Sequence, residues 1–566
     1  MDGLDHEAGK KIQEVEQEEK KTQSQIIVGL ASDMKFFYDE QGKYYAKVEL
    51  NNHSEVWPIR SKNFRNILTI RYLNLSNDKD KAPGSQAMED ALKALEARAY
   101  VSGKQENAYV RVAETYDGIY IDLCNDEWQV IEINKKGWQL LNKSPVNFIR
   151  TPNMLPLPTP KDGDIESLKP FINYGSKTDF KLIIAWLLST FKEGSPFPIL
   201  TLQGEQGSAK STTTKVLRAL VDPSGLPLRA LPDSERDMAI AANNTYILAF
   251  DNLSGFSHNV SDALCKMSTG GGLATRKLYS DDEEAVFQIM RPTILNGIDD
   301  IAKRQDLLDR SIVIDLPSIS EEKRIDEGSF WKKFTDQHPY ILGALCNVVS
   351  EALQELPNTN LKSKPRMADF ALWVTASEGA LGWDNGEFMD MYNANRDQAI
   401  DQGIESDPFA AAIVELMKHN QEWVGNASQL IAEAGRYADE RTRNSKAFPV
   451  ARTVRNRLKR INPSLRKKGI DYEPEESKKH RTLKLERCAQ TSSLASPSSP
   501  MPSSQRFEGY DVGDYKTEGY DTSSPGDDNN KTSSPYKDGH IKVGAEGDDN
   551  YDIRGLNSKN DMDITI

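Results

Sequence analysis

One stretch constrains the fold of this chain more than any other: PILTLQGEQGSAKSTTTKVLRAL, residues 198–220. Its apolar start predicts a buried strand, a turn with two glycines follows, and a helical run begins near Lys210. Similar alternation of strand, turn and helix continues to about residue 316, which is the pattern of a parallel sheet covered by helices. The stretch therefore predicts an α/β core with an anion-binding turn at the start of a helix.

The turn matches the phosphate-binding pattern GxxxxGK[ST] with one departure. Gly204 and Gly207 allow backbone N–H groups to surround a phosphate chain, and Lys210 adds a positive charge. Ala209 stands at the pattern's second glycine, where we expect a near-helical backbone that alanine tolerates. We predict that ATP and Mg²⁺ are the cofactors, with Ser211 and Asp251 as metal ligands. The predicted nucleotide-binding residues are Gly204, Glu205, Gln206, Gly207, Ser208, Ala209, Lys210, Ser211 and Thr212.

Polar residues follow the apolar segments of later strands. Asp251 ends the run TYILAF, where a carboxylate can hold Mg²⁺ through water. Asn252 stands where a catalytic glutamate is often found; it can orient water but cannot accept a proton. Asn296, in RPTILNG, is placed to sense the γ-phosphate or position water. Arg310, with Arg304 as the alternative, precedes a fifth strand, where an arginine finger would stabilise charge in a neighbouring subunit. The predicted catalytic residues are Lys210, Asp251, Asn252, Asn296 and Arg310.

A glycine-rich turn lies between these strands, in STGGGLATRKLY at residues 268–279. Arg276, Lys277 and Tyr279 follow the glycines and predict a basic and aromatic hairpin. In a ring pore such a hairpin would contact the phosphates of single-stranded DNA. A solvated surface hairpin is the alternative.

The order of these features resembles the AAA+ core of superfamily 3 helicases, and more closely the helicase-like ATPases of phages, plasmids and integrated elements. The resemblance covers residues 36–395 and is densest between 200 and 317. It implies a hexameric, ATP-driven translocase built on a P-loop AAA+ core. It also implies that Lys210, Ser211, Asp251, Asn296 and Arg310 have the roles given above.

A basic segment stands out near the C-terminus of this acidic chain, whose net charge is −14. Residues 441–487 hold 16 Lys and Arg against five acidic residues. Helix, helix and hairpin signals follow one another there, which is the order of a winged helix-turn-helix with an arginine-bearing helix in the major groove of duplex DNA. An ordinary charged helix face is the alternative. The predicted nucleic-acid contacts are Arg276, Lys277, Arg452, Arg455, Arg457, Lys459, Lys478 and Lys479.

Composition shifts divide the chain into segments. We predict an α/β P-loop core with an N-terminal α+β domain and a C-terminal winged helix-turn-helix. The predicted ranges are a flexible lead at 1–24, the α+β domain and a linker at 25–165, the ATPase core at 166–320, a helical subdomain at 321–404, the winged-helix domain at 405–488 and a disordered acidic tail at 489–566. The longest apolar run, LIIAWLLST, is far shorter than the roughly 20 residues that span a bilayer. We therefore expect a cytoplasmic protein without a membrane partner.

Three functions agree with these features. The first is an ATP-dependent DNA helicase or translocase that serves replication of a mobile genetic element and acts as a homo-oligomer, a hexamer by resemblance. The alternative is a nucleotide-gated DNA-binding switch or defence ATPase, in which Asn252 slows hydrolysis. A primase fused to its helicase ranks last, because residues 26–150 show no acidic metal triad.

Overall fold

The computed structural model describes residues 21–50, 53–75, 81–276, 284–287, 289–298, 304–445, 447–474 and 482–488. Within these ranges only the backbone is described at 273–276, 284–287, 305 and 474. Several predictions fall outside this part of the chain. They concern Lys277, Tyr279, Lys478 and Lys479, most of the flexible lead, and the acidic tail.

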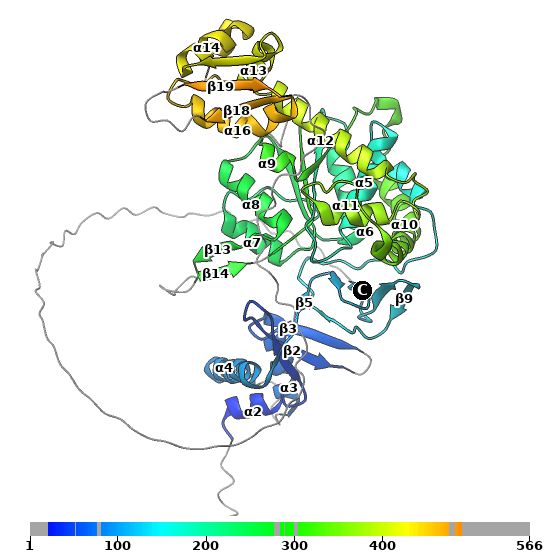
Figure 1. Cartoon of the computed structure of the whole chain (residues 1–566). Helices are drawn as coiled ribbons and strands as arrows, with labels where there is room; N and C mark the ends of the chain where they lie inside the picture. The colour runs from blue at the N-terminus through cyan, green and yellow to red at the C-terminus, as the bar shows by residue number, and fades with distance from the viewer. Residues whose placement is uncertain are drawn as a thin grey trace, which may run out of the picture. The chain divides into compact units, whose positions relative to one another are not determined.

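Residues between 199 and 315, in the turquoise-to-green part of the chain in Figure 1, form a four-stranded parallel sheet. Its strands are β11 (Ile199–Gln203), β12 (Leu248–Leu253), β15 (Thr293–Gly297) and β16 (Ser311–Asp315), in the order β12-β15-β11-β16. All three pairings are parallel, and Leu200 lies opposite both Ile294 and Ile312. The strands are largely apolar and buried, as expected of a sheet covered on both faces. The predicted α/β class with a parallel sheet is confirmed.

Helices cover both faces of this sheet. Alternate strand residues point to opposite faces and enter two different hydrophobic clusters. Leu200 and Ile312 belong to one cluster, and Ile199 and Val313 to the other. The first cluster includes residues of α5 (Lys177–Ser189), α6 (Lys210–Val221), α10 (Glu327–Glu355) and α11 (Ala368–Ala376). The second includes residues of α7 (Glu235–Asn243) and α8 (His258–Thr269), and α9 (Gln305–Leu308) adds Leu307 and Leu308 to it.

A further helix, α12 (Glu387–Glu405), packs against the edge strand β16. The Asn395 side chain accepts a hydrogen bond from the Val313 N–H at 3.1 Å and donates one to the Val313 carbonyl at 2.6 Å. These bonds satisfy backbone groups at the edge of the sheet, where no further strand pairs with β16 in the described part of the chain.

The range 25–165, predicted from the sequence as one α+β domain, holds two four-stranded sheets with different cores. The first has the order β3-β2-β1-β4 and packs against α2 (Gln23–Gly29), α3 (Lys62–Leu75) and α4 (Ser85–Ser102). Its strands are β1 (Lys35–Tyr38), β2 (Tyr44–Glu49), β3 (Ser54–Pro58) and β4 (Lys104–Gln105). The second is an antiparallel meander of β6 (Val112–Glu114), β7 (Ile119–Asp122), β8 (Val130–Asn134) and β9 (Gly137–Leu141).

The meander shares its core with the parallel sheet rather than with the first sheet. Ile121 and Ile131 belong to the same cluster as Leu200. The Trp138 indole N–H also donates to the Asn347 side chain on α10, at 2.9 Å. Beside the meander, two short strands, β5 (Ala108–Tyr109) and β10 (Asn147–Phe148), pair in parallel with each other.

A buried ion pair fastens this meander to the segment that follows α6. Arg111 is completely buried, and its Nε donates to the Asp222 carboxylate at 3.1 Å. Asp222 also accepts the backbone N–H groups of Tyr246 and Ile247, at 3.2 and 3.0 Å. The carboxylate thus holds two buried segments and one buried charge in place.

The C-terminal part of the described chain has its own small core. Its helices are α13 (Pro408–Lys418), α14 (Ala427–Ala434), α15 (Glu440–Arg443) and α16 (Val454–Lys467). Its antiparallel strands are β17 (Glu422–Gly425), β18 (Ile470–Pro474) and β19 (Leu483–Arg487), in the order β17-β19-β18. Ile413, Leu458 and Leu485 meet in its core, because the apolar positions of α16 form one stripe of an otherwise polar helix.

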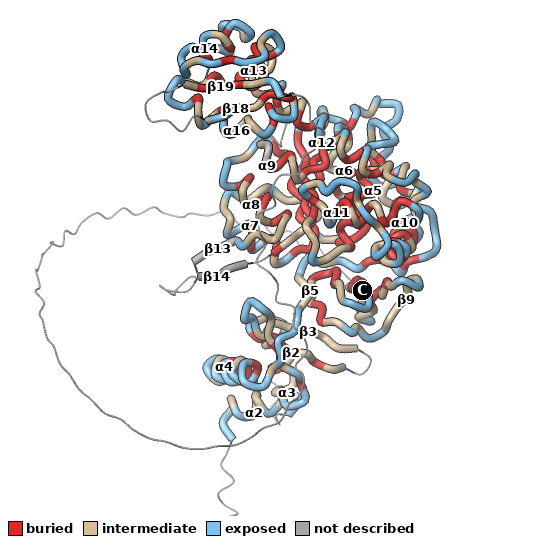
Figure 2. The backbone as a smooth tube through the Cα atoms, viewed as in Figure 1, coloured by how far each residue is buried: buried red, intermediate tan, exposed pale blue. Residues whose placement is uncertain are grey.

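Burial is concentrated around the parallel sheet (Figure 2). Trp186 and Trp373 are among the largest fully buried side chains, and each indole N–H donates to a backbone carbonyl, of Pro198 and Leu188 respectively, at 2.9 Å. Of the helices in the described ranges, none is both long and apolar enough to span a membrane.

Candidate nucleotide site

The turn between β11 and α6 has a backbone that requires glycine. Gly204 has a φ of 149°, and a Cβ there would lie 2.5 Å from the Leu316 carbonyl oxygen. Gly207 has a φ of 85°. Side chains at these two positions would meet backbone or strain the turn, so the glycines are structural requirements of a tight strand-to-helix loop.

The predicted near-helical backbone at Ala209, which alanine would tolerate, is wrong. Its φ and ψ are 56° and 30°, in the left-handed region, where alanine costs about 1–2 kcal/mol. The reason is the abrupt change of direction at this residue. Its carbonyl already accepts the Thr213 N–H at 2.9 Å within α6, while the preceding residue still belongs to the loop. A glycine at this position would remove the conflict with Cβ.

Lys210 folds back into the loop. Its Nζ donates to the carbonyl oxygens of Gly204 and Glu205 at 2.7 and 2.8 Å, and to the Ser208 hydroxyl at 3.3 Å. Burial lowers the pKa of this ammonium, and the Asp251 carboxylate opposes the shift. The charge therefore sits inside the turn.

Ser211 and Asp251 come together from α6 and the end of β12. The Ser211 hydroxyl lies 3.0 and 3.1 Å from the two carboxylate oxygens of Asp251. Mg²⁺ prefers oxygen ligands and is commonly held by one or two protein groups, waters and substrate phosphates. No group of three or more His, Cys, Asp or Glu able to hold a metal occurs in the described ranges, but a magnesium site of this kind needs none. The convergent oxygens fit such an ion.

A chain of hydrogen bonds connects the end of β12 to α6. The Asn252 N–H donates to the Asn296 amide oxygen at 3.0 Å and to Asp251 Oδ1 at 2.9 Å. The Asn296 Nδ2 donates to the Thr214 hydroxyl at 3.1 Å, and that hydroxyl donates to the Lys210 carbonyl at 2.9 Å. Asn296 is fully buried, so its side chain fixes the distance between strand and helix. Its predicted contact with water or the γ-phosphate stays a prediction.

The two candidate finger arginines are both bound within the chain. Arg310 donates to the Asp306 side chain and carbonyl, and 12% of its side chain is exposed. Arg304 donates to Asp262 and to the His258 carbonyl and is 37% exposed. Arg310 is therefore the more enclosed of the two, and to act on a neighbouring subunit it would have to leave Asp306.

The predicted DNA-contacting residues separate into exposed and partly buried ones. Arg452 and Lys459 are exposed, before and on α16. Arg455 is half-buried, and Arg457 donates to Asp407, the N-cap of α13, at 2.8 Å. Arg457 therefore joins two helices. Arg276 lies in β13 (Leu273–Arg276), which pairs with β14 (Glu284–Phe287).

Asn173 was missed from the sequence, although it touches the loop. Its Nδ2 donates to the carbonyls of Ser208, at 3.0 Å, and Pro317, at 2.6 Å. Its backbone N–H donates to the Thr213 hydroxyl at 3.3 Å. An isolated asparagine before α5 carries no pattern that would have identified it.

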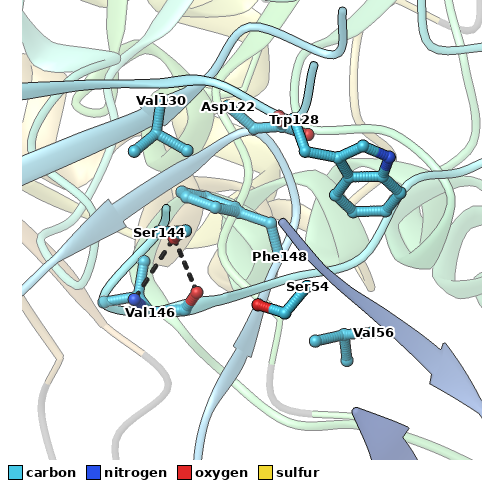
Figure 3. A pocket seen from close by; sticks show the side chains of 8 residues that line it. All are labelled: Ser54, Val56, Asp122, Trp128, Val130, Ser144, Val146 and Phe148. Carbon is cyan, nitrogen blue, oxygen red and sulfur yellow. Dashed lines mark hydrogen bonds between the residues drawn. The ribbon is translucent and has the colours of Figure 1, made fainter. Parts of the chain in front are cut away.

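A small cavity lies elsewhere, between β3 and the meander (Figure 3). Its volume of about 10 Å³ suits a single water molecule. Trp128 and Phe148 line it, and the Ser144 hydroxyl beside them bonds to the backbone of Val146. The cavity is too small for a nucleotide and shares no residue with the loop.

Comparison with known proteins finds that two parts of the chain are similar to replication proteins of mobile elements. Residues 165–402 match the family described as actinomycete integrative conjugative element replication protein, and residues 409–500 match the AICE RepA C-terminal domain. No curated protein matched the chain. Solved structures that match include "SCCmec type IV Cch - active helicase", with 14% identity, a TM-score of 0.42, and coverage of 80% of this chain and 92% of that one. Another is "The A form apo structure of NrS-1 C terminal region-CTR", with 12% identity, a TM-score of 0.34, and coverage of 82% and 98%. Over its core and its C-terminal region, the chain is thus similar to the replication proteins of actinomycete integrative conjugative elements.

Proposed function

We propose that this protein is an ATP-dependent DNA helicase or translocase that serves replication of a mobile genetic element. The observation that carries the proposal is the turn after β11, in which Lys210 donates to two loop carbonyls while the Ser211 hydroxyl donates to Asp251. The similarity of residues 165–402 to replication proteins supports the biological role.

The position of this turn in the sheet supports nucleotide binding. β11 lies between β15 and β16, so the chain leaves β11 in the middle of the sheet and returns on both sides of it. In open parallel sheets, ligands bind at the carboxyl ends of the strands where the order reverses in this way. The order of motifs also supports a P-loop AAA+ core of the superfamily 3 type.

The residues divide the work at such a site. Backbone N–H groups of residues 204–209 and the start of α6 would bind the phosphates, with Lys210 supplying a positive charge. Ser211 and Asp251 would hold Mg²⁺, which when bound neutralises phosphate charge. Asn252 is exposed at the end of β12, where it would orient a water by hydrogen bonding.

The C-terminal region would hold duplex DNA. Helix α13, strand β17, helix α14, the short helix α15, helix α16 and strands β18 and β19 follow one another, which is the order of a winged helix-turn-helix with one short helix added. Arg452 and Lys459 are exposed on the element that would enter the groove. The hairpin β13–β14 would contact single-stranded DNA in the pore of a homo-hexamer.

One assay tests the motor function. We expect single-stranded DNA to accelerate ATP hydrolysis by the full chain with Mg²⁺, and Lys210→Ala to abolish the acceleration. Lys93→Ala, at an exposed position of α4, is the control and should behave like the wild type.

Two results would contradict the proposal in different ways. Failure of the wild type to bind ATP at millimolar concentration would remove the nucleotide site. ATP binding without DNA-stimulated turnover would refute the motor function and favour the nucleotide-gated switch.

A further inference from the structure

A segment that follows β16 lies against the nucleotide loop. We call residues 316–324 the strap. The Leu316 N–H donates to the Gln203 carbonyl at 2.8 Å, and the Ile319 N–H donates to the Gly207 carbonyl at 3.3 Å. The Asn173 amide, which also holds the Ser208 carbonyl, binds Pro317. The strap therefore follows the loop along its length.

The chain after the strap is anchored as well. Helix α10 begins at Glu327, and its residue Phe334 is buried in the same hydrophobic cluster as Leu217 of α6. Arg324 thus lies between two attachments, the Ile319 bond to the loop and the buried side of α10. This restricts the space that its guanidinium can reach.

The guanidinium of Arg324 lies against the turn of the loop. A Cβ placed on Gly207 would be 3.3 Å from Arg324 Nη2. The side chain is 57% exposed, and its nearest carboxylate, Glu321, is 4.0 Å away and 88% exposed. Such an exposed pair is weak in water, so the guanidinium can exchange it for a stronger acceptor.

Lys210 and Arg324 therefore bring two positive charges to the same loop, one bonded to the Gly204 and Glu205 carbonyls and one beside Gly207. A planar guanidinium can donate two parallel hydrogen bonds to phosphate oxygens, which an ammonium cannot do. We propose that Arg324 is a further nucleotide-binding residue, which contacts phosphate oxygens of ATP bound in its own subunit. This inference rests on the proposed nucleotide site and adds a residue to it.

The test compares Arg324→Ala with Lys323→Ala in the full chain. Lys323 is the adjacent exposed cation, so its loss changes net charge equally. The measurements are the affinity for a fluorescent ATP analogue with Mg²⁺ and its displacement by inorganic triphosphate. We expect Arg324→Ala to weaken both about tenfold, as loss of a charge-assisted hydrogen bond would, and Lys323→Ala to change either by less than about twofold. Arg324→Gln, which keeps a donor without the charge, should fall between them.

Each result decides between the two levels of proposal. Absence of ATP binding by the wild type overturns the nucleotide site and this inference with it. Equal affinities of Arg324→Ala and Lys323→Ala, beside a wild type that binds, overturn the inference alone. A loss for ATP without a loss for triphosphate would place Arg324 at the base or ribose and refute the phosphate contact. Thermal unfolding of both variants shows whether the fold is intact, which the exposure of both side chains leads us to expect.

Discussion

Replacing Ala209 with glycine should stabilise this protein, which is unusual for a substitution to glycine. The left-handed backbone at Ala209 costs about 1–2 kcal/mol for alanine and little for glycine. Glycine loses more conformational freedom on folding than alanine does, and this lowers the free energy of unfolding by about 0.5–1 kcal/mol. The net effect is a gain of about 0.5–1 kcal/mol in the free energy of unfolding, or an increase of about 1–4 °C in the midpoint for a core of this size.

The matched control is Ala219→Gly, within the same helix α6. Its backbone is right-handed, so glycine there should lower the free energy of unfolding by about 0.5–1 kcal/mol. Calorimetry of the two full-length variants thus measures opposite signs for the same chemical change. Glycine adopts the same left-handed backbone readily, so Ala209→Gly should keep the shape of the loop and leave ATP affinity nearly unchanged. A decrease in the midpoint of Ala209→Gly comparable with that of Ala219→Gly would refute the reasoning.

Three further predictions concern stability and DNA binding. Asp222→Ala should lower the free energy of unfolding by about 3–5 kcal/mol, because it leaves the buried Arg111 without its paired carboxylate. Chemical denaturation measures this free energy, and a loss below about 1 kcal/mol would contradict the prediction. Lys459→Ala should reduce the slope of log affinity for duplex DNA against log salt concentration by about one, as titrations at several salt concentrations would measure. Arg457→Ala should instead lower thermal stability, because it breaks the hydrogen bond to Asp407 at the start of α13. Burial raises the pKa of Glu193 from 4.5 to about 7, so the folded state binds the extra proton and stability falls as the pH rises between those values. Glu193→Gln should flatten that decline in thermal unfolding from pH 5 to 8, and an unchanged slope would count against it.

Local patterns in the sequence predicted the class of the core. Apolar runs such as the one before Gly204 and the one before Asp251 become buried parallel strands, because their composition leaves no solvent-facing side. The surface on which the β6–β9 meander packs was not predictable in this way. Ile121 and Ile131 would suit any hydrophobic surface, and their packing on the core of the parallel sheet depends on contacts distant in sequence.

The site shows the same division between local and distant information. That Ser211 and Asp251 would approach each other follows from strands whose carboxyl ends share one edge of a sheet. The ion pairs of Arg457 and Arg310 do not follow from the sequence. A basic helix or an arginine before a strand has the same residue pattern whether or not a carboxylate pairs with it. Arg324 could not be singled out either, since it is one cation in the charged run EEKRIDE and only its contact with Gly207 sets it apart.

The two departures from the nucleotide-binding pattern have a common structural feature. Ala209 and Asn252 both have positive φ angles, 56° and 58°. Asparagine occupies this region far more readily than glutamate, and here it directs the Asn252 N–H to both Asp251 and Asn296. A glutamate at this position could act as a base only in the same left-handed backbone conformation, which is unfavourable for glutamate. The identity of residue 252 is therefore constrained by the turn that fixes the Asp251 carboxylate beside Ser211, and strain of this kind is characteristic of functional sites. The positive φ thus accounts for Asn252, whereas at Ala209 the same backbone conformation favours the glycine of the pattern.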